Sequence, residues 1–323
     1  MMRRSHFIRS LPGLALGGSM GGGAHAASPA GSLRILVPAN PGGGWDTTAR
    51  AFGRALVDSG AASAVQFDNK GGAAGAIGLA QFIHTRQADP RALLMMGSVM
   101  LGGIITTQPP VSLSQATPLA RLATEFNVFV LPANSPFKSM TELLAQLQKD
   151  PASVKWGGGS RGSTEHIAAA LLARAVGVDP NRLQFLPFRG GGEATAALLG
   201  GNVTVGGSGY SEFAESIQNG RMRAIAVTAP QRLPGLDVPT LKELGLPVEL
   251  GNWRGLYGAP GITPAQRQDL IERIVAATRH RSWQDLLDKH GWTPALLTGD
   301  AFGQFVDEEF SSLRLTLIKA GLL

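Results

Sequence analysis

The 323-residue chain contains no cysteine. It therefore has no disulfide, no thiolate metal site and no thiol nucleophile, and its stability must come from core packing, which a chain of this length can supply. It also lacks an unbroken apolar run of the roughly 18 residues that a membrane span needs, since Gly97, Gly102 and Gly103 interrupt its most apolar segment. We therefore expect the chain beyond its N-terminal segment to be soluble.

Charge of either sign is also sparse. Charged residues make up 16% of the chain, and the formal net charge is +6. It falls to +3, with 26 basic against 23 acidic residues, once Arg3, Arg4 and Arg9 leave with the N-terminal segment. No basic run carries interleaved aromatic residues, so we expect no nucleic-acid partner. The apolar fraction of 44% indicates a folded globular chain, and its length favours two domains.

Residues 1–26 have the form of an export signal. A basic start is followed by a glycine-rich apolar stretch from Leu11 to Ala24, and Ala24-His25-Ala26 has the small-x-small form of a cleavage site. We predict a signal peptide cleaved near Ala26 and a periplasmic location. The pair Arg3-Arg4 loosely resembles a twin-arginine signal, so both the twin-arginine and the general secretory routes stay open.

Short β-rich runs alternate with helical patterns along the rest of the chain. Leu33–Val37 predicts a buried strand, and the apolar spacing over Asp46–Asp58 predicts a helix. Glycine-rich turns join such pairs, which is typical of an α/β fold with mostly parallel sheets. Prolines after Leu131 and an apolar run at Leu256 indicate two crossings between halves. We predict two lobes with a ligand cleft between them, made of residues 33–132 with 255–323 and of residues 133–254.

Four glycine-rich turns recur between a strand and a helix, at residues 41–46, 71–75, 157–164 and 190–192. Helix amino termini carry unpaired backbone N–H groups, and glycine lets a ligand approach them closely. Ligands of α/β proteins bind outside the carboxyl ends of the strands, where these turns lie. Any one turn is explained equally well as a tight connection. Four turns facing one cleft predict binding of an anion with several carboxylates.

Side chains in and beside these turns add candidate donors, each with a structural alternative. The hydroxyls of Ser98, Ser160, Ser163 and Thr164 are donors or helix caps. Arg189 either neutralises a carboxylate through its planar fork or is a solvated loop arginine. We expect His166 to be a helix-start residue near the cleft rather than a base, and Asp46 to cap its helix or organise its loop. Two tryptophans, Trp45 and Trp253, wall the cleft or fill the core.

Two catalytic motifs also match the third turn. Gly158–Gly162 fits the nucleophile elbow of serine hydrolases, but Gly17–Gly21 in the export signal fits it equally well, so the pattern is weak. Gly157–Gly162 fits a dinucleotide fingerprint with Asp179 as its acidic partner. Glu165 and His166 are adjacent and point to different helix faces, so they do not predict a metal site. We rank both catalytic interpretations below binding.

Longer runs resemble one family. The run from Ile35 to Arg50, with Pro41-Gly42-Gly43-Gly44-Trp45-Asp46 at its centre, is similar to the opening of tripartite tricarboxylate transporter receptors. Asn69–Gly78 and Trp156–His166 resemble their second and third loops. Gly190–Glu193 and Asn252–Gly255 look closer to the citrate-type receptors. One departure is Gly206–Tyr210, where many relatives carry an aspartate, which bears on ligand choice.

The resemblance implies a type II periplasmic binding fold that holds its ligand through backbone amides, hydroxyls and water. It implies a receptor that captures citrate or another tri- or dicarboxylate and delivers it to a permease with one large and one small subunit. We expect a monomer, no enzyme activity, no cofactor and no protein-bound metal, while a metal–citrate complex as ligand stays open. The alternatives are an exported serine hydrolase using Ser160, and a loaded receptor that signals to a sensor kinase. The predicted ligand-binding residues are Gly43, Gly44, Trp45, Asp46, Thr47, Gly72, Ala74, Ser98, Ser160, Gly162, Ser163, Thr164, His166, Arg189, Gly190, Gly191 and Ser208.

Overall fold

The structure is a computed structural model that describes residues 31–188 and 191–323, so the segment predicted as an export signal lies outside the described residues. Ten strands within these residues form one continuous sheet in the order β2-β1-β3-β9-β4-β7-β5-β6, with β8 and β10 also paired to β4. The strands are β1 Leu33–Val37, β2 Val65–Asn69, β3 Ala92–Gly97, β4 Thr117–Pro132, β5 Lys155–Gly158, β6 Gln184–Pro187, β7 Val205–Gly209, β8 Met222–Val227, β9 Gly251–Gly258 and β10 Thr293–Thr298.

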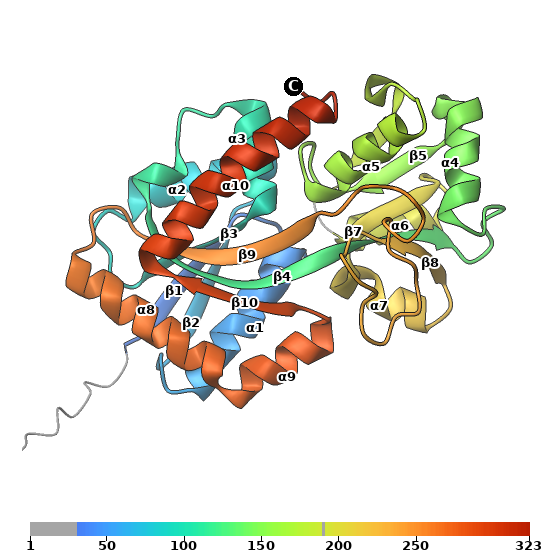
Figure 1. Ribbon diagram of the computed structural model, residues 1–323. Coiled ribbons are helices and arrows are strands. Elements are labelled where there is room, and N and C mark those ends of the chain that lie inside the picture. The colour runs from blue at the N-terminus through green and yellow to red at the C-terminus, as the bar shows by residue number, and fades with distance from the viewer. Residues whose placement is uncertain (1–30, 189–190) are drawn as a thin grey trace, which may run out of the picture.

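Helices cover this sheet on both sides (Figure 1). In the half that contains β1 to β3, helix α10 packs with α3 on one side, and α8 and α9 pack with α1 on the other. No helix of the described residues is both long and apolar enough to cross a membrane. The helices are α1 Gly44–Asp58, α2 Ala76–Thr85, α3 Ser98–Thr107, α4 Met140–Lys149, α5 Thr164–Ala175, α6 Gly191–Leu199, α7 Tyr210–Gln218, α8 Pro264–Arg279, α9 Arg281–His290 and α10 Gly299–Lys319.

Parallel pairing occupies the two flanks of the sheet. Strands β2, β1 and β3 are parallel to one another, as are β7, β5 and β6. Between these flanks, β9 and β4 pair antiparallel with each other and with their outer neighbours β3 and β7. The predicted α/β class is confirmed, and the antiparallel centre arises because β4 and β9 are the strands that connect the two halves.

Strand β4 belongs to both halves. Its residues 117–126 pair with β9, whereas residues 127–132 pair with β7 and β8. The buried apolar side chains divide in the same way, since one cluster joins β1 to β3 with the C-terminal helices and two further clusters fill the other half. The C-terminal helices therefore return to the first half, as the sequence predicts, while the division at residues 132 and 254 stays a prediction.

Local sequence signals set where the helices begin. Ser139 precedes α4 and accepts a hydrogen bond from the backbone N–H of Glu142. Thr263 and Gln266 form a reciprocal capping box before α8, whose first residue is Pro264. These caps satisfy backbone donors that an α-helix leaves unpaired at its amino end. The starts of α4 and α8 therefore follow from short-range chemistry, whereas the pairing of β4 and β9 depends on contacts distant in sequence.

The two halves touch where α3 meets the loop before α5. A Cβ atom placed on Gly102 would lie 2.1 Å from the carbonyl oxygen of Gly162, and one placed on Gly162 would lie 2.9 Å from Oγ1 of Thr106. Gly162 also has a φ of +79°, which favours glycine. The absence of side chains at these two positions therefore allows the backbones of the two halves to approach each other.

We predict that Gly102→Ala destabilises the protein although alanine is the better helix former. The new methyl group must displace the backbone of Gly162, and overpacking of this kind costs about 1–3 kcal/mol. Gly192→Ala in α6 is the matched control, because nothing lies within 4 Å of its Cβ position. Urea unfolding of both variants measures the difference, and equal free energies of unfolding would show that the close approach does not constrain the fold.

Candidate ligand-binding site

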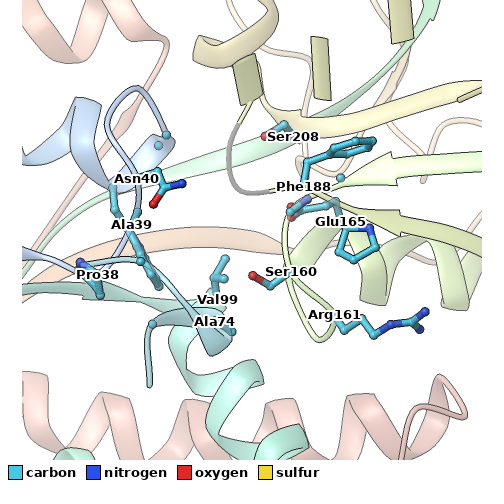
Figure 2. Close-up of a pocket in the computed structure, with 18 of the residues that line it drawn as sticks. Pro38, Ala39, Asn40, Ala74, Val99, Ser160, Arg161, Glu165, Phe188 and Ser208 are labelled. Carbon is cyan, nitrogen blue, oxygen red and sulfur yellow. The ribbon is translucent and has the colours of Figure 1, made fainter. Parts of the chain in front are cut away.

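A cavity of about 640 Å³ lies between the two halves, at the ends of strands from both (Figure 2). Segments after β1, β2 and β3 line it from one half, and the loop after β5 lines it from the other. Asn40 projects into the space from the first side, and Ser160 points across it towards Val99 (Figure 2). The lining residues are Pro38, Ala39, Asn40, Gly43, Gly44, Trp45, Gly71, Gly72, Ala73, Ala74, Gly75, Val99, Thr107, Gly158, Gly159, Ser160, Arg161, Glu165, Pro187, Phe188, Ala194, Ser208, Glu212, Asn252 and Arg254.

A buried carboxylate shapes the first loop. Asp46 lies in the first turn of α1, and its carboxylate accepts hydrogen bonds from the backbone of Gly42 at 2.9 Å, from Asn69 at 2.9 Å and from Arg50 at 2.9 Å. Burial by itself raises the pKa of Asp46, but these hydrogen bonds and the charge of Arg50 outweigh it, so the pKa is lowered. Asp46 organises the loop, and it does not line the cavity.

The second loop has a left-handed backbone. Gly72, Ala73, Ala74 and Gly75 have φ angles of +132°, +47°, +52° and +96°. Alanine in this region costs about 1–2 kcal/mol per residue, so surrounding contacts must hold the conformation. One such contact is with Gly103 of α3, where an added Cβ would lie 2.3 Å from the Cβ of Ala74. The sequence predicts the glycines here but gives no sign that the alanines share their conformation.

The third loop is held by side chains from the start of α5. Glu165 accepts a hydrogen bond from the backbone of Gly159 at 2.6 Å and another from Thr164 Oγ1 at 3.1 Å. Asn127 of β4 donates to Thr164 Oγ1 at 2.8 Å, which ties this network to the central strand. Burial raises the pKa of Glu165 against the effect of these bonds. Ser163 is the N-cap of α5 and accepts from the backbone of His166.

His166 is a buried and structural side chain. Its Nδ1 accepts a hydrogen bond from the backbone of Gly162 at 3.0 Å, and its ring packs against Phe185 with centroids 4.3 Å apart. Burial, with a smaller contribution from the charge of Arg161, lowers its pKa to about 4. The ring is therefore neutral at pH 7 with Nδ1 already used as an acceptor.

The structure brings part of the predicted site together. Seven of the predicted residues line the cavity: Gly43, Gly44, Trp45, Gly72, Ala74, Ser160 and Ser208. Seven others lie behind the lining, where most make hydrogen bonds within the protein: Asp46, Thr47, Ser98, Gly162, Ser163, Thr164 and His166. Gly191 begins α6, while Arg189 and Gly190 lie outside the described residues.

Trp45 and Trp253 lie in different environments. Trp45 lines the cavity, whereas Trp253 is core, packed edge-on against Phe302 and donating from Nε1 to Glu309. The strand β9 that carries Trp253 explains this, because successive side chains of a strand point to opposite faces. Its neighbours Asn252 and Arg254 line the cavity instead.

Several lining residues were not predicted as ligand contacts. Asn40 belongs to the first loop, and its position just before the glycines could have identified it as a candidate ligand contact. Arg254 and Asn252 were noted only for their family resemblance, because they lie far along the chain from the glycine turns. Glu212 lies in the first turn of α7, four residues after Ser208 of β7, and accepts a hydrogen bond from the Ser208 hydroxyl.

The charged side chains of the lining are not equivalent. Arg161 is exposed, and its guanidinium extends away from the cavity (Figure 2). Arg254 is buried, and its Nη2 lies 2.7 Å from Oε2 of Glu125 in an ion pair. Among the described residues, no cluster of three or more histidines, aspartates or glutamates is placed to hold a metal ion.

Neither catalytic motif has the geometry that its chemistry requires. Ser160 lies inside a five-residue loop between β5 and α5, whereas a nucleophile elbow places its serine at a direct strand-to-helix turn. The nearby His166 is neutral with Nδ1 occupied. Asp179 is exposed and caps the short 3-10 turn that follows α5, whereas a dinucleotide fold places its acidic partner at the end of the next strand.

Comparisons with known proteins agree on one family and one fold. Residues 54–322 match the family described as "Tripartite tricarboxylate transporter family receptor". The "UPF0065 protein in tcbD-tcbE intergenic region" of Pseudomonas sp. strain P51 is 31% identical over 255 residues, which cover 77% of this chain and 73% of that protein.

Solved structures show the same architecture. A "Structure of a periplasmic transporter" is 25% identical, has a TM-score of 0.83, and aligns with 92% of this chain and 99% of its own. MatC from Rhodopseudomonas palustris, solved with bound malate, is 23% identical with a TM-score of 0.79, covering 90% of this chain and 100% of its own. The predicted two-lobed periplasmic binding fold is confirmed.

We predict that His166 makes the stability of the protein pH-dependent. Its pKa is about 4 when folded and about 6.5 when unfolded, so the unfolded chain binds more protons between these values. Stability is fully present above pH 6.5 and falls as the pH drops towards 4. From pH 7 to pH 4.5 the loss from this group is about 2 kcal/mol.

The control is His166→Asn, whose Oδ1 can accept from Gly162 in place of Nδ1 but does not titrate. Urea unfolding of both proteins between pH 7 and pH 4.5 isolates the histidine. The stability advantage of the wild type over the variant should shrink by about 2 kcal/mol across this range. An advantage that does not change with pH would mean that His166 titrates normally in the folded protein.

Proposed function

Because the chain belongs to the tripartite tricarboxylate transporter receptor family, we propose that it captures a small di- or tricarboxylate, such as malate or citrate, in the cavity between its lobes. In this proposal the loaded receptor closes and delivers its ligand to a membrane permease with one large and one small subunit. The protein is then a carrier that performs no chemistry on what it binds. Malate is the bound ligand of the similar MatC, and it supports the dicarboxylate arm of the proposal.

The observation that carries the proposal is the backbone lining of the cavity. Gly44 and Trp45 begin α1, so unpaired N–H groups of this helix start border the cavity, and the backbone of Gly72 to Gly75, which leads into α2, lines it as well. Such groups favour negative charge through the positive end of the helix dipole. A volume of about 640 Å³ falls within the usual range of small-molecule sites.

Polar side chains complete the donor set. Asn40 and Ser160 face the cavity from opposite sides, so a ligand between them would contact both lobes (Figure 2). Contacts to both lobes are what would stabilise a closed form over an open one, since a ligand shifts such an equilibrium only through its difference in affinity for the two states. We take the lobes to be residues 33–132 with 255–323 and residues 133–254.

The same proposal fixes where the protein works. A periplasmic receptor must be exported, and residues 1–26 have the composition of a signal peptide cleaved near Ala26. The neutral, buried His166 supports binding rather than hydrolysis, because it supplies no free Nδ1 acceptor to activate Ser160. We propose that the receptor acts as a monomer without a cofactor.

We predict that at least one carboxylate raises the thermal unfolding midpoint. Ligand at about 100 times its dissociation constant stabilises the folded state by about 2.7 kcal/mol, which corresponds to several degrees for a protein of this size. The panel is citrate, isocitrate, tricarballylate, succinate, malate, glutamate and terephthalate, with sodium chloride at equal ionic strength as the reference.

Two asparagine variants locate the effect. Asn40→Ala removes a side chain that projects into the cavity and should reduce the shift, whereas Asn134→Ala changes an exposed asparagine outside the lining and should leave it intact. If no member of the panel raises the midpoint of the wild type, the carboxylate-receptor proposal fails. If both variants reduce the shift equally, the ligand binds elsewhere.

A further inference from the structure

A buried ion pair lies behind the cavity, where the two halves join. Arg254 of β9 and Glu125 of β4 approach to 2.7 Å, and their side chains are only 4% and 0% exposed. The other carboxylate oxygen of Glu125, Oε1, accepts hydrogen bonds from the backbone N–H and the hydroxyl of Ser211 in α7. Glu125 is thus fixed by the second half, and it holds Arg254 in place.

The guanidinium of Arg254 has donor capacity that the protein does not use. Among the described residues its Nε has no hydrogen-bond partner, and Nη1 makes only a long contact of 3.5 Å to the carbonyl of Asn252. A buried charged donor without an acceptor is unfavourable, and it is normally paired in native structures. Arg254 lines the cavity, so a carboxylate bound there lies close to this incompletely paired positive charge.

The guanidinium also lies against the start of α1. A Cβ atom placed on Gly44 would lie 2.5 Å from Nη2 of Arg254, so only glycine leaves room for this contact. Gly44 and Trp45 contribute unpaired backbone N–H groups at the same point. Next to them, the carboxamide oxygen of Asn252 accepts from Ser98 Oγ at 3.1 Å, which leaves the NH₂ group of Asn252 as its remaining donor.

We propose that Arg254 is a specificity-determining residue whose guanidinium attracts one carboxylate of the ligand to the amino end of α1. This inference rests on the proposed function and adds to it the residue that selects for a negatively charged ligand. Glu125 has two effects in this arrangement. It orients the guanidinium, and its own negative charge opposes the incoming carboxylate.

The two possible roles of Arg254, as half of a purely structural ion pair or as a residue that attracts the ligand, predict different effects of substitution. Arg254→Gln and Glu125→Gln break the same pair, so a structural role predicts that both weaken binding through the same distortion. A role in attracting the ligand predicts opposite changes in affinity. Arg254→Gln weakens binding because it removes the attracting charge, and Glu125→Gln strengthens binding because it removes the opposing charge. Arg54→Gln is the matched control, since Arg54 is an exposed arginine of α1 that lies outside the lining.

The experiment is titration calorimetry of the full-length protein and its variants with malate, succinate and citrate. For the probe that the wild type binds most tightly, Arg254→Gln should weaken affinity about 10-fold or more, as expected for loss of a charge-assisted hydrogen bond. Glu125→Gln should bind that probe more tightly than the wild type, and Arg54→Gln should stay within about twofold.

The double variant Glu125→Gln with Arg254→Gln guards against misfolding, because it replaces the ion pair by two neutral amides and leaves no unpaired buried charge. It should be folded, and it should bind more weakly than the wild type but less weakly than Arg254→Gln, because it lacks both the attracting and the opposing charge. Wild-type affinity in Arg254→Gln or in the double variant would overturn the inference, as would equal weakening in Arg254→Gln and Glu125→Gln, and the proposed function would still stand. A wild type that binds none of the three probes would instead contradict the proposed function itself.

Discussion

The cavity depends on one recurring interaction, in which a side-chain acceptor at the start of a helix folds back onto the glycine loop that precedes it. Asp46 accepts from the backbone of Gly42, and Glu165 accepts from the backbone of Gly159. His166 does the same for Gly162 through a neutral nitrogen. Glycine-rich loops are flexible on their own, so these contacts are what give them one conformation. The N–H groups that remain unpaired are then presented to the cavity in fixed positions.

For the anionic ligand of the proposed function, this arrangement offers a cavity whose lining carries little net formal charge. Hydrogen-bond donors of the protein occupy the carboxylates of Asp46 and Glu165, and Glu125 balances the charge of Arg254, the buried arginine of the described lining. Backbone dipoles and hydroxyls are already oriented before a ligand arrives, so binding need not reorganise them. Strand β4 runs through both halves and β9 pairs with its first part, which places Glu125 and Arg254 near the junction of the halves.

The sequence predicts local features of this structure better than distant contacts. The glycine turns, the role of Asp46 as loop organiser and the return of the C-terminal helices all follow from spacing and turn chemistry. The hydroxyls of Ser163 and Thr164 illustrate the limit, because a serine or threonine before a helix is equally suited to capping and to ligand binding. Here Ser163 caps α5 and Thr164 joins Asn127 to Glu165. The partnership of Glu125 with Arg254 joins strands far apart in the sequence, and no local pattern predicts it.

The central claim is that a small carboxylate binds between the lobes against the glycine loops. A crystal structure of the protein with the panel member that stabilises it most tests this claim most directly. We expect the ligand in the cavity of Figure 2, with carboxylate oxygens within hydrogen-bond distance of the backbone at Gly44, Trp45 or Ala74 and in contact with Ser160 of the other half. A ligand bound outside this cavity, or one that contacts a single lobe, would contradict the account.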